Sequence, residues 1–179
     1  YKYILFFGII RDYKGLDLLL EAFSKMEYRE MGLKLLVAGE YYSNEEKYQA
    51  QIKSLNLEAD VIVVNKFIKD SEVGHYFCAC DIIAQPYKNA TQSGVTQIAY
   101  HFETPILVTN VGGLPEMIPH EKVGYVVPKD TAEISLALTR YFAEGKHAEF
   151  KENLKVEKQK YLWDKLADKI LGLADKINR

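Results

Sequence analysis

Apolar runs without polar alternation recur along almost the whole chain, and segments with helical periodicity separate them. Strands of this kind are buried on both faces, which is typical of a parallel sheet covered by helices on each side. Right-handed crossovers make such a sheet doubly wound and Rossmann-like. We therefore expect an α/β fold with about six strands. The expected strands are Tyr3–Phe7, Leu33–Ala38, Val61–Val64, Ile82–Ala84, Ile106–Val108 and Tyr125–Val127, and the expected helices are Leu16–Met26, Glu45–Leu55, Glu72–Ala79 and Ala132–Phe142.

The length of 179 residues suits one domain, for which roughly 100–200 residues are typical. Residues 1–145 carry the alternating pattern and form the expected core. From about Lys146 the composition becomes charged and helix-favouring, so residues 146–179 are interpreted as peripheral helices of the same domain. Their apolar stripe would consist of Trp163, Leu166, Ile170 and Leu173. Because the chain begins inside a strand, we expect it to be part of a longer protein.

The formal net charge of -2 gives no broad electrostatic reason to expect nucleic acid. No apolar run approaches the roughly 18 residues that a membrane span needs, and no signal-peptide pattern is present. Cys78 and Cys80 lie two positions apart on an expected helix and point to different faces. We interpret them as small buried hydrophobes in a reducing compartment. These features predict a cytoplasmic protein without a transmembrane segment.

Two loops that follow apolar strands suit an anionic ligand. Thr91-Gln92-Ser93-Gly94 opens a helix, and the first amides of a helix are unpaired and favour negative charge. Gly112-Gly113 follows the next strand and gives a second place where the backbone can approach a ligand. The carboxyl edge of an open parallel sheet is where nucleotides bind, so the sequence predicts a nucleotide phosphate site here.

The loop from Gly8 to Gly15 places two cations, Arg11 and Lys14, at the same edge. Fixed cations stabilise the charge that a departing diphosphate gains as its bond breaks. The alternative is that both cations are solvated and that the two glycines are ordinary turn residues.

Six segments follow one another along the chain in this order: FFGIIRDYKGLDLLLEAF, LKLLVAGE, VGHYFCACDIIAQPY, TPILVTNVGGLPEMI, GYVVP and LWDKLADKILGL. Together and in this order, they resemble the carboxyl-terminal half of a group 1 (family 4) glycosyltransferase. Enzymes of this family have two Rossmann-like domains (the GT-B fold), and the carboxyl-terminal half holds the nucleotide-sugar donor. The resemblance covers nearly the whole chain, and the ordered set is specific although no single motif is.

The resemblance implies that Lys14 contacts the donor diphosphate. The family more often carries an arginine directly after the glycine, where this chain has Ile9, so Arg11 is the substitute. The implied donor-binding positions are Gly8, Phe67, Ile68, Gln92, Ser93, Gly94, Gly112, Gly113 and Glu116. Ser93 and Gly94 would supply amides to the phosphates, whereas core packing is the alternative for Phe67 and Ile68. Glu116 matches the family's Gly-Gly-x-x-Glu, and a favourable first-turn charge is its alternative.

The chain departs from the family at a pair of glutamates eight positions apart. These positions fall on Ala90 and Ile98. The second glutamate binds ribose hydroxyls in the family, and isoleucine has no acceptor that could replace it. Gln92 and Gln97 are the nearest polar side chains, and Gln97 faces elsewhere than residue 98 on a helix.

Other chemistries lack their motifs: the chain has no Gly-x-Gly-x-x-Gly after a strand, no P-loop, no Gly-x-Ser-x-Gly elbow and no Asp-x-Asp pair. The four histidines are scattered without metal-ligand spacing. The resemblance therefore implies a retaining, metal-independent transfer of a sugar from a nucleotide-diphosphate sugar to a glycan or lipid-linked acceptor, without a cofactor. The acceptor would be held by an N-terminal domain absent from this chain, and the full-length protein could be peripheral at the inner face of the membrane.

Two alternatives stay open. One is a non-catalytic nucleotide-binding or scaffold module derived from such an enzyme, which the substitutions at Ala90 and Ile98 favour. The other is a sugar-nucleotide epimerase, which would need an acid–base constellation that the carboxylates of this chain do not form visibly. If the protein is a glycosyltransferase, we expect this part of it to bind nucleotide weakly and to turn over nothing alone, because the acceptor-binding half is missing.

Overall fold

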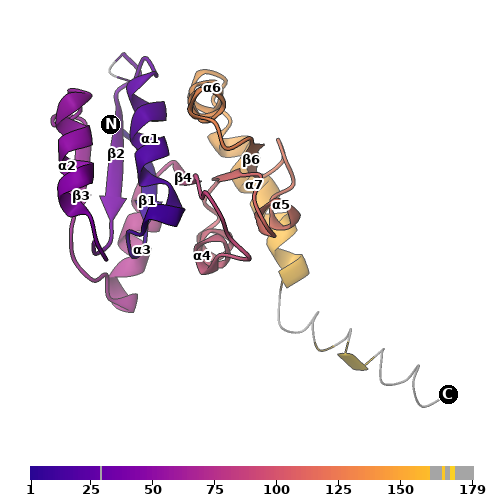
Figure 1. Cartoon of the computed structure of the whole chain (residues 1–179). Coiled ribbons are helices and arrows are strands. Elements are labelled where there is room, and N and C mark those ends of the chain that lie inside the picture. Colours follow the sequence, from indigo (N-terminus) through magenta and orange to yellow (C-terminus); the bar gives the residue numbers. More distant parts are fainter. Residues whose placement is uncertain (29, 162–166, 168–169, 172–179) are drawn as a thin grey trace.

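A computed structural model of the chain describes residues 1–28, 30–161, 167, 170 and 171. Its centre is one parallel sheet with the strand order β3-β2-β1-β4-β5-β6 (Figure 1). The strands are β1 (Lys2–Phe7), β2 (Leu33–Ala38), β3 (Val61–Val64), β4 (Ile82–Gln85), β5 (Ile106–Thr109) and β6 (Gly124–Val127). The expected doubly wound sheet of six strands is therefore confirmed.

Helices cover both faces of the sheet. Alternate residues of β1 separate two cores: Ile4 and Phe6 pack with α1, α2 and α6, whereas Leu5 packs with α3, α4 and α5. Helix α7 contributes Phe150 to the first core and Leu154 to the second. The helices are α1 (Leu16–Ser24), α2 (Glu45–Ser54), α3 (Asp70–Ala79), α4 (Gly94–Phe102), α5 (Leu114–Met117), α6 (Thr131–Ala143) and α7 (His147–Glu157), with 3-10 turns η1 (Asp12–Lys14) and η2 (Lys158–Tyr161).

Differences from the sequence prediction are confined to element ends and to the C-terminal segment. Helix α3 begins two residues earlier than predicted, because the extended Lys69 lets Asp70 enter the first turn. Cys80 is buried but Cys78 is exposed, so only one of the two cysteines is a buried hydrophobe; both are free. Of the predicted apolar stripe, Trp163, Leu166 and Leu173 lie outside the described residues, and Ile170 is 57% exposed.

The strand order changes direction between β1 and β4, so the loops that follow these strands diverge at the carboxyl edge of the sheet (Figure 1). Such a switch point is where open α/β sheets bind ligands. The β1 loop contains Arg11 and Lys14, and the β4 loop leads into Ser93 and α4. Within the described residues, no helix is both long enough and apolar enough to cross a membrane.

Candidate functional site at the sheet switch point

The β1 loop folds back so that Lys14 lies against Gly8. Gly8 has a φ of +93°, and a Cβ built on it would lie 2.9 Å from Lys14 Nζ and 4.0 Å from Val95 Cγ2 in the first turn of α4. Gly8 therefore separates the lysine head from α4 by little more than its own backbone. Gly15 has a φ of +71°, and its Cβ would lie 2.0 Å from Pro86 O. Both positions require glycine, and the second holds the β1 loop against the β4 loop.

Lys88 joins the same two loops through backbone and side chain. Its amide donates to Tyr13 O at 2.6 Å. Its ammonium lies 3.1 Å from the Asp12 carboxylate and 2.8 Å from Asp17 Oδ2. Lys47 of α2 adds a 3.0 Å ion pair to Asp12, and hydrogen bonds from Lys47 and Lys88 lower the pKa of that carboxyl. This network fixes the turn η1, which ends at Lys14.

Lys14 is only 9% exposed. Among the residues that the structure describes, its ammonium forms neither a salt bridge nor a side-chain hydrogen bond, and it lies 5.9 Å from the centroid of the Tyr87 ring. Burial, with a smaller effect of the Arg11 charge, lowers the pKa of Lys14 from 10.5 to about 8. An uncompensated buried ammonium is costly unless an anion pairs with it, so this position is electrostatically prepared for an anionic ligand.

Tyr87 connects the start of α4 with Lys14, because it contacts both Ser93 and the lysine ammonium. Ser93 is the N-cap residue, yet its side chain does not cap the helix; Ser93 Oγ lies 3.3 Å from the Tyr87 hydroxyl. Tyr87 is held in turn by Thr109, whose hydroxyl donates to Tyr87 O at 2.6 Å. A Cβ on Gly94 would meet no atom within 4 Å, so the first turn of α4 is open. We refer to Lys14, Tyr87, Ser93 and Gly94 together as the Lys14 corner.

Tyr87 is the residue of this corner that the sequence did not predict. Its ring is almost fully buried, and burial raises its pKa to about 12, so the phenol keeps its proton at neutral pH. It can therefore donate a hydrogen bond to Ser93 or to a ligand oxygen. Its position directly after the strand that borders the switch point was the available signal.

The Gly112-Gly113 loop packs on the segment that precedes α4. A Cβ on Gly112 would lie 1.5 Å from Ala90 O, and the Gly113 amide donates to Thr91 O at 2.9 Å. Contact between two backbones thus accounts for both glycines, and a donor role for them stays a prediction. Glu116 is exposed in the first turn of the four-residue α5.

Arg11 lies away from the Lys14 corner. It is exposed, and its guanidinium stacks 4.2 Å from the centroid of the Tyr42 ring in the β2 loop. Ile9, at the position where the resemblance implies an arginine, is 44% exposed. The structure thus brings only one of the two predicted cations into the buried corner.

A cavity of about 210 Å³ continues from Gly8 toward β2 and β3. Most of its lining is apolar, and its only two ionisable residues are Glu40 and Asp70. We call it the apolar cavity; its lining residues are Phe7, Gly8, Ile9, Gly39, Glu40, Phe67, Ile68, Asp70, Val73 and Ile98. The predicted Phe67 and Ile68 are therefore brought together with Ile98.

The two glutamines nearest to Ile98, Gln92 and Gln97, lie outside the apolar cavity. Gln97 donates to Met117 Sδ at 3.7 Å, and Gln92 is exposed in the loop that precedes the helix. Neither lines the apolar cavity, so this helix presents no carboxylate or amide there.

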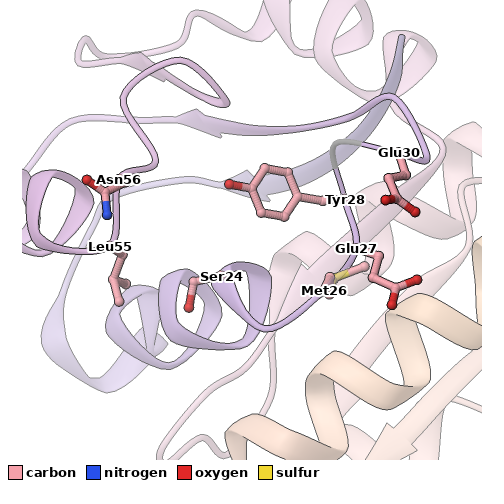
Figure 2. Close-up of a pocket in the computed structure, with 7 residues that line it drawn as sticks. All are labelled: Ser24, Met26, Glu27, Tyr28, Glu30, Leu55 and Asn56. Carbon is pink, nitrogen blue, oxygen red and sulfur yellow. The ribbon is translucent and has the colours of Figure 1, made fainter.

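A larger cavity of about 360 Å³ lies at the opposite edge of the sheet, where β2 and β3 begin (Figure 2). Tyr28 spans it, and the carboxylates of Glu27 and Glu30 lie to one side of the ring (Figure 2). None of the predicted site residues lines it. Because ligands of open α/β sheets bind at the carboxyl edge, the Lys14 corner and the apolar cavity form the candidate site. Among the described residues, no group of three or more potential metal ligands occurs.

Comparisons with known proteins identify the fold and the family of the chain. An uncharacterized glycosyltransferase of Methanocaldococcus jannaschii is 27% identical over 96% of this chain and 44% of its own length, so the chain spans less than half of that relative. The C-terminal domain of a group 1 glycosyl transferase from Francisella tularensis has the same fold, with a TM-score of 0.79 and 20% identity over 88% of this chain and 84% of that one. Anabaena HepE in complex with UDP-glucose matches with a TM-score of 0.77 and 19% identity, over 98% of this chain and 49% of that one. The family model "Glycosyl transferases group 1" matches residues 1–144, and the chain therefore belongs to the group 1 glycosyl transferases.

Proposed function

We propose that this chain is the donor-binding half of a glycosyltransferase that uses a nucleotide-diphosphate sugar. The observation that carries the proposal is the buried Lys14, which lies beside Gly8 and the open first turn of α4 and for which the described residues supply no ionic partner. A diphosphate would supply the anion that this ammonium lacks. The nucleoside would then occupy the apolar cavity on the β2–β3 side.

In this proposal the Lys14 corner acts on the departing nucleoside diphosphate. As the sugar–phosphate bond breaks, negative charge accumulates on the leaving oxygen. The Lys14 ammonium and the backbone amides at the start of α4 are fixed in place and stabilise that charge without reorganisation. Catalysis by this half would then require no metal, and Arg11 would contribute only if it left its stack on Tyr42.

The acceptor would be held by a second domain, as the length of the curated relative suggests. The proposed reaction is retaining, with a glycan or lipid-linked acceptor, and the proposed location is cytoplasmic or peripheral to the inner face of the membrane. Because the acceptor half is outside this chain, we expect the chain to bind nucleotide and to turn over nothing alone.

Calorimetric titration of this chain with UDP, GDP and ADP tests the proposal. We expect one of them to bind and Lys14→Ala to weaken that binding about 10- to 100-fold, because a charged hydrogen bond contributes roughly 1.5–3 kcal/mol. Lys25→Ala is the matched control, since Lys25 is an exposed lysine at the other end of α1 and pairs with nearby Glu21 and Thr131. Failure of all three nucleotides to bind, or equal effects of both variants, would reject the assignment.

A second function is favoured by the apolar residues at Ala90 and Ile98: a nucleotide-binding or scaffold module without catalysis. The two proposals differ in one observable. Release of nucleoside diphosphate from a nucleotide sugar by the full-length protein, lost in Lys14→Ala, would support the transferase and reject the module.

A further inference from the structure

We propose that Glu40 binds the ribose hydroxyls of the nucleotide and so makes the site selective for ribonucleotides. This inference rests on the proposed nucleotide-binding function and adds a specific contact to it. It is argued from the chemistry of the apolar cavity and from the position of the β2 loop.

The lining of the apolar cavity suits a base but offers little to a sugar. Phe67, Val73 and Ile98 provide apolar surface, and Phe67 is 65% exposed, so it is free to cover a flat ligand. A ribose presents two neighbouring hydroxyl donors. Two carboxylate oxygens accept both at once, and the cavity contains two carboxylates, Glu40 and Asp70.

The backbone places Glu40 firmly at this cavity. Gly39 has a φ of +152°, and a Cβ on it would lie 2.1 Å from Gly8 O, so the ends of β1 and β2 touch here. The Ile10 amide donates to Glu40 O at 2.8 Å. Tyr41, the next residue, packs against the core of α1 and α2, whereas Ala38, two residues earlier, belongs to the core of α3 and α4.

Side chains alternate along an extended segment, which directs Glu40 to the face where Ile98 lies. Since β1 lies between β2 and β4, Glu40 is also one strand further from the Lys14 corner than Gly8. A nucleotide whose phosphates lie at Lys14 would have its ribose over Gly8, within reach of the β2 loop.

The carboxylate of Glu40 is available for this role. Glu40 is exposed, and within the part of the chain that the structure describes its carboxylate forms no hydrogen bond or ion pair. Asp70, in contrast, occupies the first turn of α3, where a negative charge stabilises the helix. The fold accounts for Asp70, whereas nothing in the described structure uses the side chain of Glu40.

The test measures affinity for UDP, GDP and ADP against their 2′-deoxy counterparts, in the wild-type chain and in Glu40→Gln. We expect the wild type to prefer the ribonucleotide about tenfold, and Glu40→Gln to lose this preference by weakening ribonucleotide binding alone. Asp70→Asn is the matched control and should keep the preference. Ile98→Glu in the Glu40→Gln background should restore it, because it returns a carboxylate to the same cavity.

The outcomes separate the two levels of the proposal. If no nucleoside diphosphate binds to the wild type, the proposed function fails and the role of Glu40 fails with it. If nucleotide binds and Glu40→Gln keeps the full ribose preference, or if Asp70→Asn removes it instead, only the role of Glu40 is rejected. Because Glu40 is exposed, Glu40→Gln should keep the wild-type melting temperature.

Discussion

The Lys14 corner and the apolar cavity adjoin at Gly8 but are built in opposite ways. The corner is fixed by backbone overlap that only glycine permits and by an ion network around Lys88. The cavity is lined by partly exposed side chains such as Phe67, and its carboxylate at Glu40 has no partner in the described structure. The difference teaches that changes in the corner alter stability and binding together, whereas changes to the exposed side chains of the cavity alter binding alone.

The largest effect is expected at Gly15. Gly15→Ala places a Cβ 2.0 Å from Pro86 O at a φ of +71°, so the contact between the β1 and β4 loops must open. We expect the free energy of unfolding to fall by more than about 3 kcal/mol. Denaturant unfolding measures this loss.

Gly94→Ala is the control for that substitution. Its Cβ enters open space, so we expect a change within about 1 kcal/mol, in the stabilising direction that alanine favours in a helix. Equal losses in the two variants would show that the loops are not held together as described.

Lys14→Met should change stability and nucleotide binding in opposite directions. Folding lowers the pKa of Lys14 from 10.5 to about 8, so the unfolded chain holds the proton more tightly and wild-type stability rises between about pH 8 and 10.5. Removing the ammonium should raise the free energy of unfolding at pH 7 by up to about 3 kcal/mol. Unfolding curves should show this difference in the free energy of unfolding between variant and wild type at pH 7, and its near disappearance at pH 10.5. A Lys14→Met protein that is less stable than the wild type at pH 7 would contradict the electrostatic argument.

Lys88→Met should have an intermediate effect of about 1–2 kcal/mol on stability, because it removes charged hydrogen bonds to the partly exposed Asp12 and Asp17. Nucleotide binding should weaken as well, since the turn that carries Lys14 loses its support. Lys66→Met, which breaks an exposed pair with Glu72, should change neither quantity measurably. A Lys88→Met protein with intact affinity would mean that Lys14 is positioned by other contacts.

The smallest effect on stability is expected in the apolar cavity. Phe67 is 65% exposed, so Phe67→Ala should change the free energy of unfolding by less than about 0.5 kcal/mol. It should nevertheless weaken nucleotide binding several-fold by removing surface from the base. A thermal melt tests the prediction for stability, and a calorimetric titration of the same sample tests the prediction for binding. A strongly destabilised variant would place Phe67 in the core instead.

The apolar runs of the sequence were enough to predict the sheet, because strands such as β4 and β5 are buried on both faces and their composition reflects this. The loops that follow β1 and β4 could also be identified, since a parallel order brings strand ends together. That Lys14 is buried whereas Arg11 is exposed could not be predicted. They lie three residues apart, and their surroundings come from Tyr42 and Tyr87, which are distant in sequence.

The contacts that hold the loops of the site in place could not be predicted either. Lys88 forms ion pairs with Asp12 and Asp17, and Lys47 also pairs with Asp12. No spacing in the sequence indicates that these charges meet. The Gly-Gly pair was recognisable, but its contact with the segment before α4 depends on how two loops cross. Local patterns thus predicted which loops lie at the carboxyl edge of the sheet, and only the structure showed what holds them there.

The central claim is that nucleotide binds at the carboxyl edge, across the Lys14 corner and the apolar cavity. Amide chemical shifts of the isotopically labelled chain, followed during titration with the nucleoside diphosphate that binds best, test it directly. We predict that the shifts concentrate at Gly8, Ser93, Gly94 and Val95, with smaller ones at Phe67 and Glu40. Shifts concentrated instead at Tyr28, Glu30 and Asn56, around the larger cavity of the opposite edge (Figure 2), would contradict the account.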